Sequence, residues 1–326
     1  MLLARRPFRA MGSPCELHLY GESRSRCDAL IERAIAEVAR LERKYSRYRD
    51  DSVTSAINSS AGDASGVVVD DETASLLDYA ATAHATSGGL FDPTSGVLRR
   101  AWNFKSGRVP TLAELDAVLP LVGWQRLAWR RPKLSLPHAG MELDFGGFVK
   151  EYAADRVVEL CRAGGARHGM VDLGGDLAVI GPHPDGKPWI VGIRDPRAPK
   201  GAMASVRLGA CAIATSGDYE RCMIVDGVRY TRVLDPRSGW PVTGMRSVSV
   251  VADRCLVAGT ATTVAMLKGA SEGARWLDEL GLPNLRMNDA GEVSGTLATS
   301  ERGAAQPERS PPATRIACVR SSGLEK

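Results

Sequence analysis

Several motifs that would fix a function class are absent from this sequence of 326 residues. No C-x-x-C pair occurs among its seven cysteines, and an odd number of cysteines does not fit a disulfide framework. We therefore expect small buried thiols in a reduced compartment, and neither a zinc site nor a disulfide-stabilised fold. No H-E-x-x-H pattern occurs, and without G-x-G-x-x-G a nicotinamide-type Rossmann site is unsupported.

The sequence also lacks a strong charge imbalance and long apolar runs. The net charge is only +4, and the basic residues are scattered in short pairs without interleaved aromatics, which argues against a nucleic-acid partner. The longest apolar runs are too short to span a bilayer. The first eight residues, Met1–Phe8, have no apolar segment after their arginines, so we expect no signal peptide or lipoprotein leader and a cytoplasmic location.

The order of the expected elements predicts the fold class. A hydrophobic content of 44% suffices for one large domain or two ordinary ones. Helical patterns dominate the first half and strand patterns the second, without regular βαβ alternation, which predicts a compact α+β fold. No linker is evident, so we expect one domain over residues 1–298. Residues 299–326 are rich in Ser, Pro, Arg and Glu, and we expect a disordered tail.

Apolar periodicity predicts the main helices. A helix is expected over Ser25–Lys44, opened by a capping box of Ser25 and Asp28, and followed by two exposed tyrosines, Tyr45 and Tyr48. The pair Thr111 and Glu114 predicts the start of another short helix. The remaining expected elements are a helix over 71–85, a hairpin over 124–136, and two late helices over 256–268 and 270–280.

The stretch from Leu143 to Asp155 is the most informative part of the chain. It predicts the end of a short strand (141–145), a turn at Gly146 and Gly147, and the first turns of a helix. A helix N-terminus beside glycines and Lys150 suits a phosphate-bearing ligand. The alternative is a strand–turn–helix corner whose glycines only permit tight packing, and a Gly-Gly turn alone does not decide between the two.

A second segment has the spacing of a phosphate-binding loop but lacks the residues that such a loop needs. Residues 181–187 have the glycine and lysine spacing of a P-loop, but Pro188 stands where a hydroxyl should follow the lysine. Pro182, Pro184 and Pro188 also remove backbone donors that a phosphate cradle needs. We interpret it as an ordinary turn.

A series of small polar turns remains, and their order along the chain resembles a known family. The turns are Met11-Gly-Ser13, Ser46-Arg-Tyr48, Ser87-Gly-Gly-Leu-Phe91-Asp-Pro-Thr94, Asp144-x-Gly-Gly-x-x-Lys150, Asp172-Leu-Gly-Gly-Asp176, Thr215-Ser-Gly-Asp-Tyr219, Leu234-Asp-Pro-Arg-Ser-Gly239 and Ala258-Gly-Thr-Ala-Thr-Thr263. Over roughly residues 8–293 this pattern is similar to the bacterial FAD:protein FMN transferases, the ApbE-type flavin transferases.

The resemblance implies a chemistry. Enzymes of this family split FAD, attach FMN through a phosphoester to a threonine or serine of a partner flavoprotein, release AMP and need Mg²⁺. The implied fold is a compact α+β structure with FAD in a central cleft. The implied FAD-contacting residues are Met11, Tyr48, Leu90, Phe91, Asp92, Asp144, Lys150 and Leu234. The implied metal ligands are the Gly147 carbonyl and the Thr263 hydroxyl, and the candidate catalytic residues are Asp155, Arg232 and Lys150.

Three positions depart from the family pattern. Gly259 stands where the family usually has a metal-binding aspartate, so one hard oxygen ligand is missing. Arg232 replaces a usual histidine, and an arginine stays protonated and cannot act as a general base. Glu151 follows Lys150 where glycine is more usual. Two alternatives therefore stay open beside the transferase: an FAD pyrophosphatase, and a flavin-binding protein that has lost catalysis.

Overall fold

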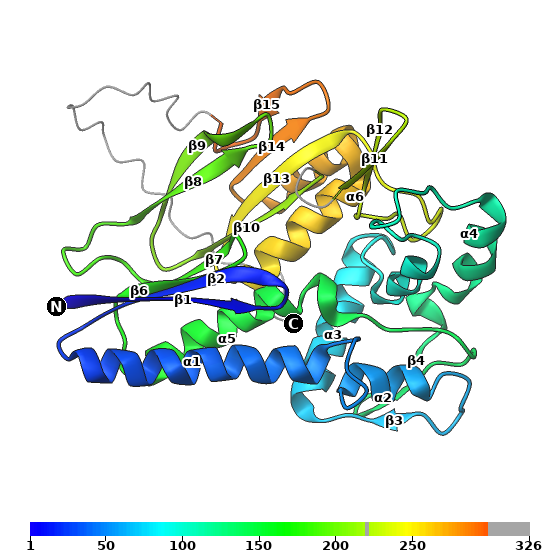
Figure 1. Cartoon of the computed structure of the whole chain (residues 1–326), viewed down its shortest axis with the longest axis horizontal. Helices are drawn as coiled ribbons and strands as arrows, with labels where there is room; N and C mark the ends of the chain where they lie inside the picture. The colour runs from blue at the N-terminus through cyan, green and yellow to red at the C-terminus, as the bar shows by residue number, and fades with distance from the viewer. Residues whose placement is uncertain (219–221, 299–326) are drawn as a thin grey trace.

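The computed structural model describes residues 1–218 and 222–298, which form a mixed structure of sheet and helices (Figure 1). Tyr219 and the expected tail over 299–326 lie outside the described residues.

The main sheet has eight strands, and every neighbouring pair in it is antiparallel. In spatial order the strands are β1 (Leu2–Ala10), β2 (Ser13–Gly21), β6 (Gly169–Leu173), β7 (Asp176–Gly181), β10 (Ala212–Gly217), β13 (Met245–Ala252), β14 (Asn284–Asn288) and β15 (Val293–Ser294). Along β2 the buried residues alternate, with Cys15, Leu17 and Leu19 on the buried face. A sheet of this kind, built without parallel βαβ units, agrees with the α+β expectation.

Three long helices pack with this sheet. They are α1 (Arg24–Tyr45), α5 (Val149–Ala163) and α6 (Cys255–Leu280). Helix α5 contacts both α1 and α6, and α6 lies against β10 and β13 (Figure 1). Leu17, Ile31 and Val157 meet in the main hydrophobic core between these layers. The backbone of α6 breaks at Gly269 (φ 75°, ψ −177°), where the sequence predicted the boundary between two helices.

A second group of elements follows α1 in the chain. Its helices are α2 (Val53–Ser59), α3 (Asp71–Thr86) and α4 (Leu112–Val118), with 3₁₀ turns η1 (Pro93–Arg100), η2 (Leu119–Leu121), η3 (Trp124–Arg126) and η4 (Phe145–Gly147). A small sheet joins β3 (Val67–Val68), β5 (Lys133–Ser135) and β4 (Ala128–Arg130). The predicted hairpin over 124–136 is confirmed by β4 and β5, and the predicted Thr111–Glu114 capping box is confirmed at α4.

Two further hairpins complete the described structure. They are β8 (Trp189–Asp195) with β9 (Ala198–Leu208), and β11 (Cys222–Val225) with β12 (Val228–Thr231). Among the described residues no disulfide joins the six cysteines, and five of these are buried, as the sequence predicted.

The predicted strand over 141–145 is wrong. This segment pairs with a side chain instead of a neighbouring strand, because Leu143 N donates to Asn58 Oδ1 (2.7 Å) and Asn58 Nδ2 donates to Leu143 O (3.1 Å). The amide of Asn58 satisfies the backbone groups that a ladder would otherwise use. The turn after it is the 3₁₀ turn η4, and α5 begins only at Val149.

Two expectations at the ends of α1 are also wrong. Ser23 caps this helix by accepting a hydrogen bond from Arg26 N, whereas Asp28 forms ion pairs with Arg6 and Arg24 instead of completing a capping box. Tyr45 is buried, with its ring 4.9 Å from that of Phe145, while Tyr48 is exposed as expected. The last turn of α1 therefore still faces the core.

Within residues 1–218 and 222–298, every helix is too short or too polar to cross a membrane.

Candidate active site

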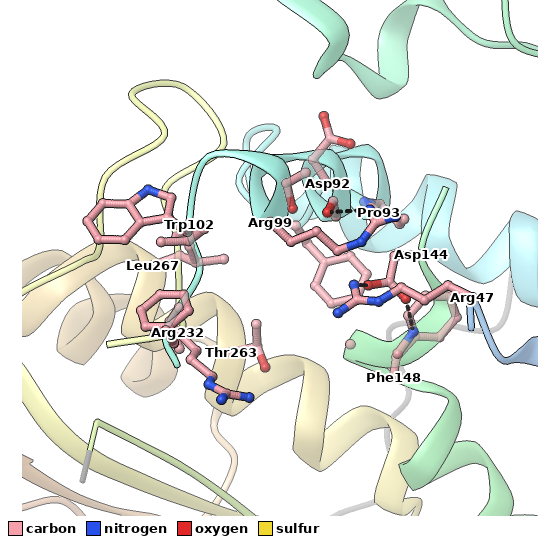
Figure 2. Close-up of a pocket in the computed structure, with 18 of the residues that line it drawn as sticks. Arg47, Asp92, Pro93, Arg99, Trp102, Asp144, Phe148, Arg232, Thr263 and Leu267 are labelled. Atoms are coloured by element: carbon pink, nitrogen blue, oxygen red, sulfur yellow. Dashed lines mark hydrogen bonds and ion pairs between the residues drawn. The ribbon is translucent and has the colours of Figure 1, made fainter. Parts of the chain in front are cut away.

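A pocket of about 770 Å³ opens where η1, η4, the segment after β12 and the middle of α6 meet (Figure 2). The lining residues are Arg47, Tyr48, Leu90, Phe91, Asp92, Pro93, Ser95, Gly96, Arg99, Arg100, Trp102, Asn103, Phe104, Lys105, Asp144, Gly146, Gly147, Phe148, Arg232, Val233, Leu234, Thr263 and Leu267. Five of these side chains are cationic and two are acidic, so the pocket suits an anionic ligand.

Most of the sequence-predicted site residues meet in this pocket. The nine that line it are Tyr48, Leu90, Phe91, Asp92, Asp144, Gly147, Arg232, Leu234 and Thr263. They come from five separate segments of the chain, which the fold brings together at one pocket. Met11, Lys150 and Asp155 are not among its lining residues. The individual roles of all twelve residues stay predictions.

Sequence reasoning missed most of the positive charge. Arg47, Arg99, Arg100 and Lys105 line the pocket, whereas the short basic pairs in the sequence predict only scattered charge. The buried carboxylate of Glu142 pairs with both Arg99 and Arg100, so one negative charge faces two positive ones. Two features of the sequence could have indicated this charge: Arg47 is next to Tyr48, and the arginine pair follows shortly after Asp92.

Asp144 fixes the floor of the pocket. Its carboxylate forms an ion pair with Arg47 and accepts a hydrogen bond from Gly146 N (2.8 Å), which opens the turn η4 (Figure 2). Gly96 allows η1 to approach this side chain, because a Cβ at position 96 would lie 2.5 Å from the Asp144 Cβ. The Asp144 backbone also donates to Pro93 O (2.9 Å). These contacts hold the Gly146–Gly147 backbone at the edge of the pocket.

Asp92 uses its carboxylate to hold the wall of the pocket. One oxygen accepts hydrogen bonds from Thr94 N (2.8 Å) and Thr94 Oγ1 (2.6 Å), which caps η1. The other oxygen accepts a hydrogen bond from Trp124 N (3.0 Å). Because both oxygens are engaged, Asp92 positions the neighbouring Leu90 and Phe91 in the wall.

Arg232 and Thr263 lie together on the opposite side of the pocket from Arg47 and Asp144 (Figure 2). The Arg232 guanidinium lies 5.5 Å from the centre of the Phe104 ring, and that ring stacks on Trp102 with centroids 5.5 Å apart. Trp102 is fixed in turn by a hydrogen bond from its indole N–H to Gly239 O (2.7 Å). The two aromatic rings therefore hold the Arg232 side chain in place, and the charge of Arg232 stays available to a ligand.

Thr263 and Gly147 are the two predicted metal ligands, and both line the pocket. A Cβ at Gly147 would have no atom within 4 Å, so a ligand can approach this backbone closely. Among the described residues, no three His, Cys, Asp or Glu side chains gather into a metal-binding group. A metal here would thus take few protein oxygens and complete its shell with phosphate and water, which Mg²⁺ commonly does.

Lys150 does not line the pocket and instead forms a buried ion pair. Its ammonium lies 2.5 Å from Asp176 Oδ2, and Asp176 is 3% exposed. The other oxygen of Asp176 accepts a hydrogen bond from Thr215 N (3.1 Å). Burial opposes the charged form of the lysine, but the carboxylate outweighs it and raises the pKa of Lys150. Lys150 thus neutralises a buried acid between α5 and the sheet.

Asp155 and Met11 have structural contacts outside the pocket. The Asp155 carboxylate accepts hydrogen bonds from Cys255 N (2.8 Å) and Leu256 N (3.0 Å), the first amides of α6. Burial raises the pKa of Asp155 to about 6, although these two bonds oppose the shift. Met11 occupies the turn between β1 and β2 at φ 50°, and its N–H donates to Glu42 Oε1 (2.8 Å).

Glu151 and Gly259, two of the departures from the family pattern, lie against each other. A Cβ at Gly259 would lie 2.5 Å from Cγ and 3.1 Å from Oε1 of Glu151. The other carboxylate oxygen, Oε2, is buried and has no hydrogen-bond partner among the described residues. Burial, and then the nearby carboxylate of Asp176, raise the pKa of Glu151 well above its usual range. A buried oxygen without a donor fits a cation.

Comparison with known proteins agrees with this geometry. The ApbE family profile matches residues 11–285. A "FAD:protein FMN transferase" of Treponema pallidum is 33% identical over 290 residues, covering 82% of this chain and 80% of the relative. A protein of the same name from Klebsiella pneumoniae is 32% identical over 269 residues, covering 81% of this chain and 82% of the relative.

Solved structures show the same fold. The crystal structure of an ApbE protein from Thermotoga maritima superposes with a TM-score of 0.84 at 29% identity, covering 90% of this chain and 97% of that one. The apo form of the Pseudomonas stutzeri flavinyl transferase ApbE gives a TM-score of 0.80 at 28% identity, covering 91% and 95%.

Proposed function

Because the chain belongs to the ApbE family, as predicted from its turns, we propose that it is an FAD:protein FMN transferase that acts on a threonine or serine of a partner flavoprotein. It is a transferase of the ApbE fold, since the family, the curated relatives and the solved structures agree. The observation that supports this function best is one cationic, aromatic-walled pocket that contains nine of the predicted site residues.

The pocket offers distinct surroundings to the parts of FAD. Aromatic rings of Tyr48, Phe91, Phe104 and Phe148 line it and can pack against flat heterocycles. We place the pyrophosphate between Arg232 and the open backbone of Gly147, so that it meets positive charge on one side and a backbone that permits close approach on the other. The segment of Leu90 and Phe91 then borders the adenosine side, as the resemblance implies.

The proposed reaction is an in-line displacement at phosphorus. The acceptor hydroxyl oxygen forms a bond to the FMN-side phosphorus, and the bond from that phosphorus to the bridging oxygen breaks. AMP leaves with the bridging oxygen, and the hydroxyl proton is released to solvent. Such transfers depend mainly on positioning and on neutralising the phosphoryl oxygens, and Arg232 supplies one full positive charge for this.

The predicted Mg²⁺ fits the oxygen donors at this position. The Gly147 carbonyl and the Thr263 hydroxyl would hold it, and both are hard ligands on the pocket wall. When bound, Mg²⁺ would supply charge stabilisation to the phosphoryl oxygens. A cytoplasmic location stays a prediction.

Two alternatives have specific support. In an FAD pyrophosphatase, water replaces the acceptor hydroxyl in the same pocket. In a flavin-binding protein without catalysis, Arg232 and Gly259 would mark the loss of the usual histidine and aspartate. The three functions differ in their products.

Incubation with FAD and Mg²⁺, with and without a purified flavodomain, separates the three. The proposal predicts AMP release that depends on the flavodomain, with little free FMN. AMP and free FMN in equal amounts without any acceptor would indicate a pyrophosphatase. Bound but unconsumed FAD in both reactions would indicate a binding protein.

A further inference from the structure

Two departures from the family pattern, far apart in the chain, form one contact in the structure. Glu151 lies in the first turn of α5 and Gly259 in the second turn of α6. The Glu151 side chain occupies the space that a side chain at position 259 would need, since a Cβ there would lie 3.0 Å from the Glu151 Cδ. A buried glycine inside a helix costs about 1 kcal/mol relative to alanine, so it needs a reason. Here the reason is the room it makes for Glu151.

The carboxylate delivered to this space lies beside Asp176 and Lys150, and one of its oxygens is left without a donor. Its Oε2 is buried and has no hydrogen-bond partner among the described residues. Lys150, whose charge acts on Glu151, is already engaged at 2.5 Å by Asp176. A buried carboxylate oxygen without a donor is costly to desolvate, and a bound cation would offset that cost.

The same space adjoins a predicted metal ligand. Gly259 precedes Thr263 by one helical turn, so the two positions lie on one face of α6. The Thr263 side chain lines the pocket, and the turn between Gly259 and Thr263 is fixed by a hydrogen bond from Thr262 Oγ1 to Gly259 O (2.8 Å). The Glu151 carboxylate, packed against Gly259, therefore lies where an acidic side chain at position 259 would lie.

We propose that Glu151 supplies the metal-binding carboxylate that position 259 lacks, so that α5 provides the ligand instead of α6. This inference rests on the proposed function, because it concerns the Mg²⁺ that assists FMN transfer. The inference also predicts the effect of a side chain at position 259. An aspartate there would collide with Glu151, so Gly259→Asp alone does not improve the site, and only the exchange of both residues keeps one carboxylate.

The test measures metal affinity directly. Mn²⁺ is titrated into the full chain saturated with FAD, without acceptor, and free Mn²⁺ is followed by electron paramagnetic resonance. Glu151→Gln keeps the side-chain volume and should raise the Mn²⁺ dissociation constant by about tenfold or more. Glu159→Gln, on the same helix but paired with Arg156 and Arg254, is the matched control and should leave it unchanged.

A double variant that combines Glu151→Gly with Gly259→Asp keeps the test decisive if a single variant folds poorly. Glu151→Gly should weaken Mn²⁺ binding, Gly259→Asp should not tighten it, and the double variant should restore the natural affinity. Unchanged Mn²⁺ affinity in Glu151→Gln, or a double variant that binds Mn²⁺ as weakly as Glu151→Gly, would overturn the assignment.

FAD binding in EDTA separates this inference from the proposed function. Flavin fluorescence reports whether FAD binds each variant when no metal is present. If the natural chain does not bind FAD, the proposed function fails. If it binds FAD but Glu151→Gln does not alter Mn²⁺ affinity, only the role of Glu151 fails.

Discussion

At the scale of single residues, Lys150 has a contact that the sequence did not predict. The family resemblance implies that it contacts FAD, and in the structure its ammonium pairs with the buried Asp176. Lys150→Ala should lower the free energy of unfolding by about 2–3 kcal/mol, because it leaves a buried carboxylate uncompensated and the lysine side chain is 25% exposed. Urea denaturation in EDTA measures this change.

An exposed pair provides the control for Lys150. Lys187 and Asp185 form an ion pair whose side chains are 79% and 52% exposed, so Lys187→Ala should leave the stability nearly unchanged. If Lys150→Ala is as stable as Lys187→Ala but binds FAD poorly, the lysine serves the ligand, as the sequence first indicated.

Arg232 tests the charge of the pocket. Arg232→Gln should weaken FAD binding by about 1.5–3 kcal/mol, because it removes one charge-assisted contact to the pyrophosphate. Arg237→Gln is the control, since Arg237 pairs with Asp235 in the same segment and does not line the pocket. Fluorescence titrations at low and high salt measure both. Equal FAD affinity for the two variants would contradict the placement of the pyrophosphate at Arg232.

Local chemistry made some residues predictable and others not. The Thr111–Glu114 cap depends on neighbours in sequence, and the structure forms it as expected. The contacts of Lys150 with Asp176 and of Asn58 with Leu143 join distant segments, and no local pattern reports them. The same limit applies to Glu151 and Gly259, where each departure was visible in the sequence but their contact was not.

At the scale of elements, Asp155 couples α5 to the start of α6 and makes stability depend on pH. Burial raises its pKa to about 6, above the usual value of 3.8, so the folded state holds the proton more tightly than the unfolded state. The contribution of Asp155 to the free energy of unfolding therefore falls by up to about 3 kcal/mol as the pH rises from about 4 to about 6, and it is constant above that range.

Asp155→Asn should remove this pH-dependent part of the free energy of unfolding. The difference in unfolding free energy between the natural chain and the variant, measured by urea denaturation from pH 4 to 7, should change through this window and then level off. A difference that stays constant across the whole range would mean that Asp155 ionises with its ordinary pKa in the folded state.

The break in α6 at Gly269 is a second element-scale feature. The sequence predicted two helices here, and the structure joins them through a backbone conformation (φ 75°, ψ −177°) that nearly only glycine adopts. Gly269→Ala should destabilise the fold by about 1–3 kcal/mol. Gly209→Ala is the control, because a Cβ there would meet no atom within 4 Å and should cost little. Equal melting temperatures for both variants would contradict the strain at Gly269.

At the scale of the whole molecule, the order of turns predicted more than any single motif. Tyr48, Phe91, Asp144, Arg232 and Thr263 come from separate segments, yet the sheet and helices bring them to one pocket. The family resemblance supplied this arrangement, and the predicted fold is confirmed by the solved ApbE structures. What the resemblance could not supply is how this chain compensates for its own departures, because that depends on packing between α5 and α6.

The central claim is that the pocket transfers FMN to a protein hydroxyl, and the intact mass of an acceptor flavodomain tests it most directly. After incubation with the chain, FAD and Mg²⁺, the acceptor should gain the mass of FMN less one water. An acceptor whose target threonine or serine is replaced by alanine should gain nothing. If FAD is consumed while the acceptor keeps its original mass, the chain hydrolyses FAD and is not an FMN transferase.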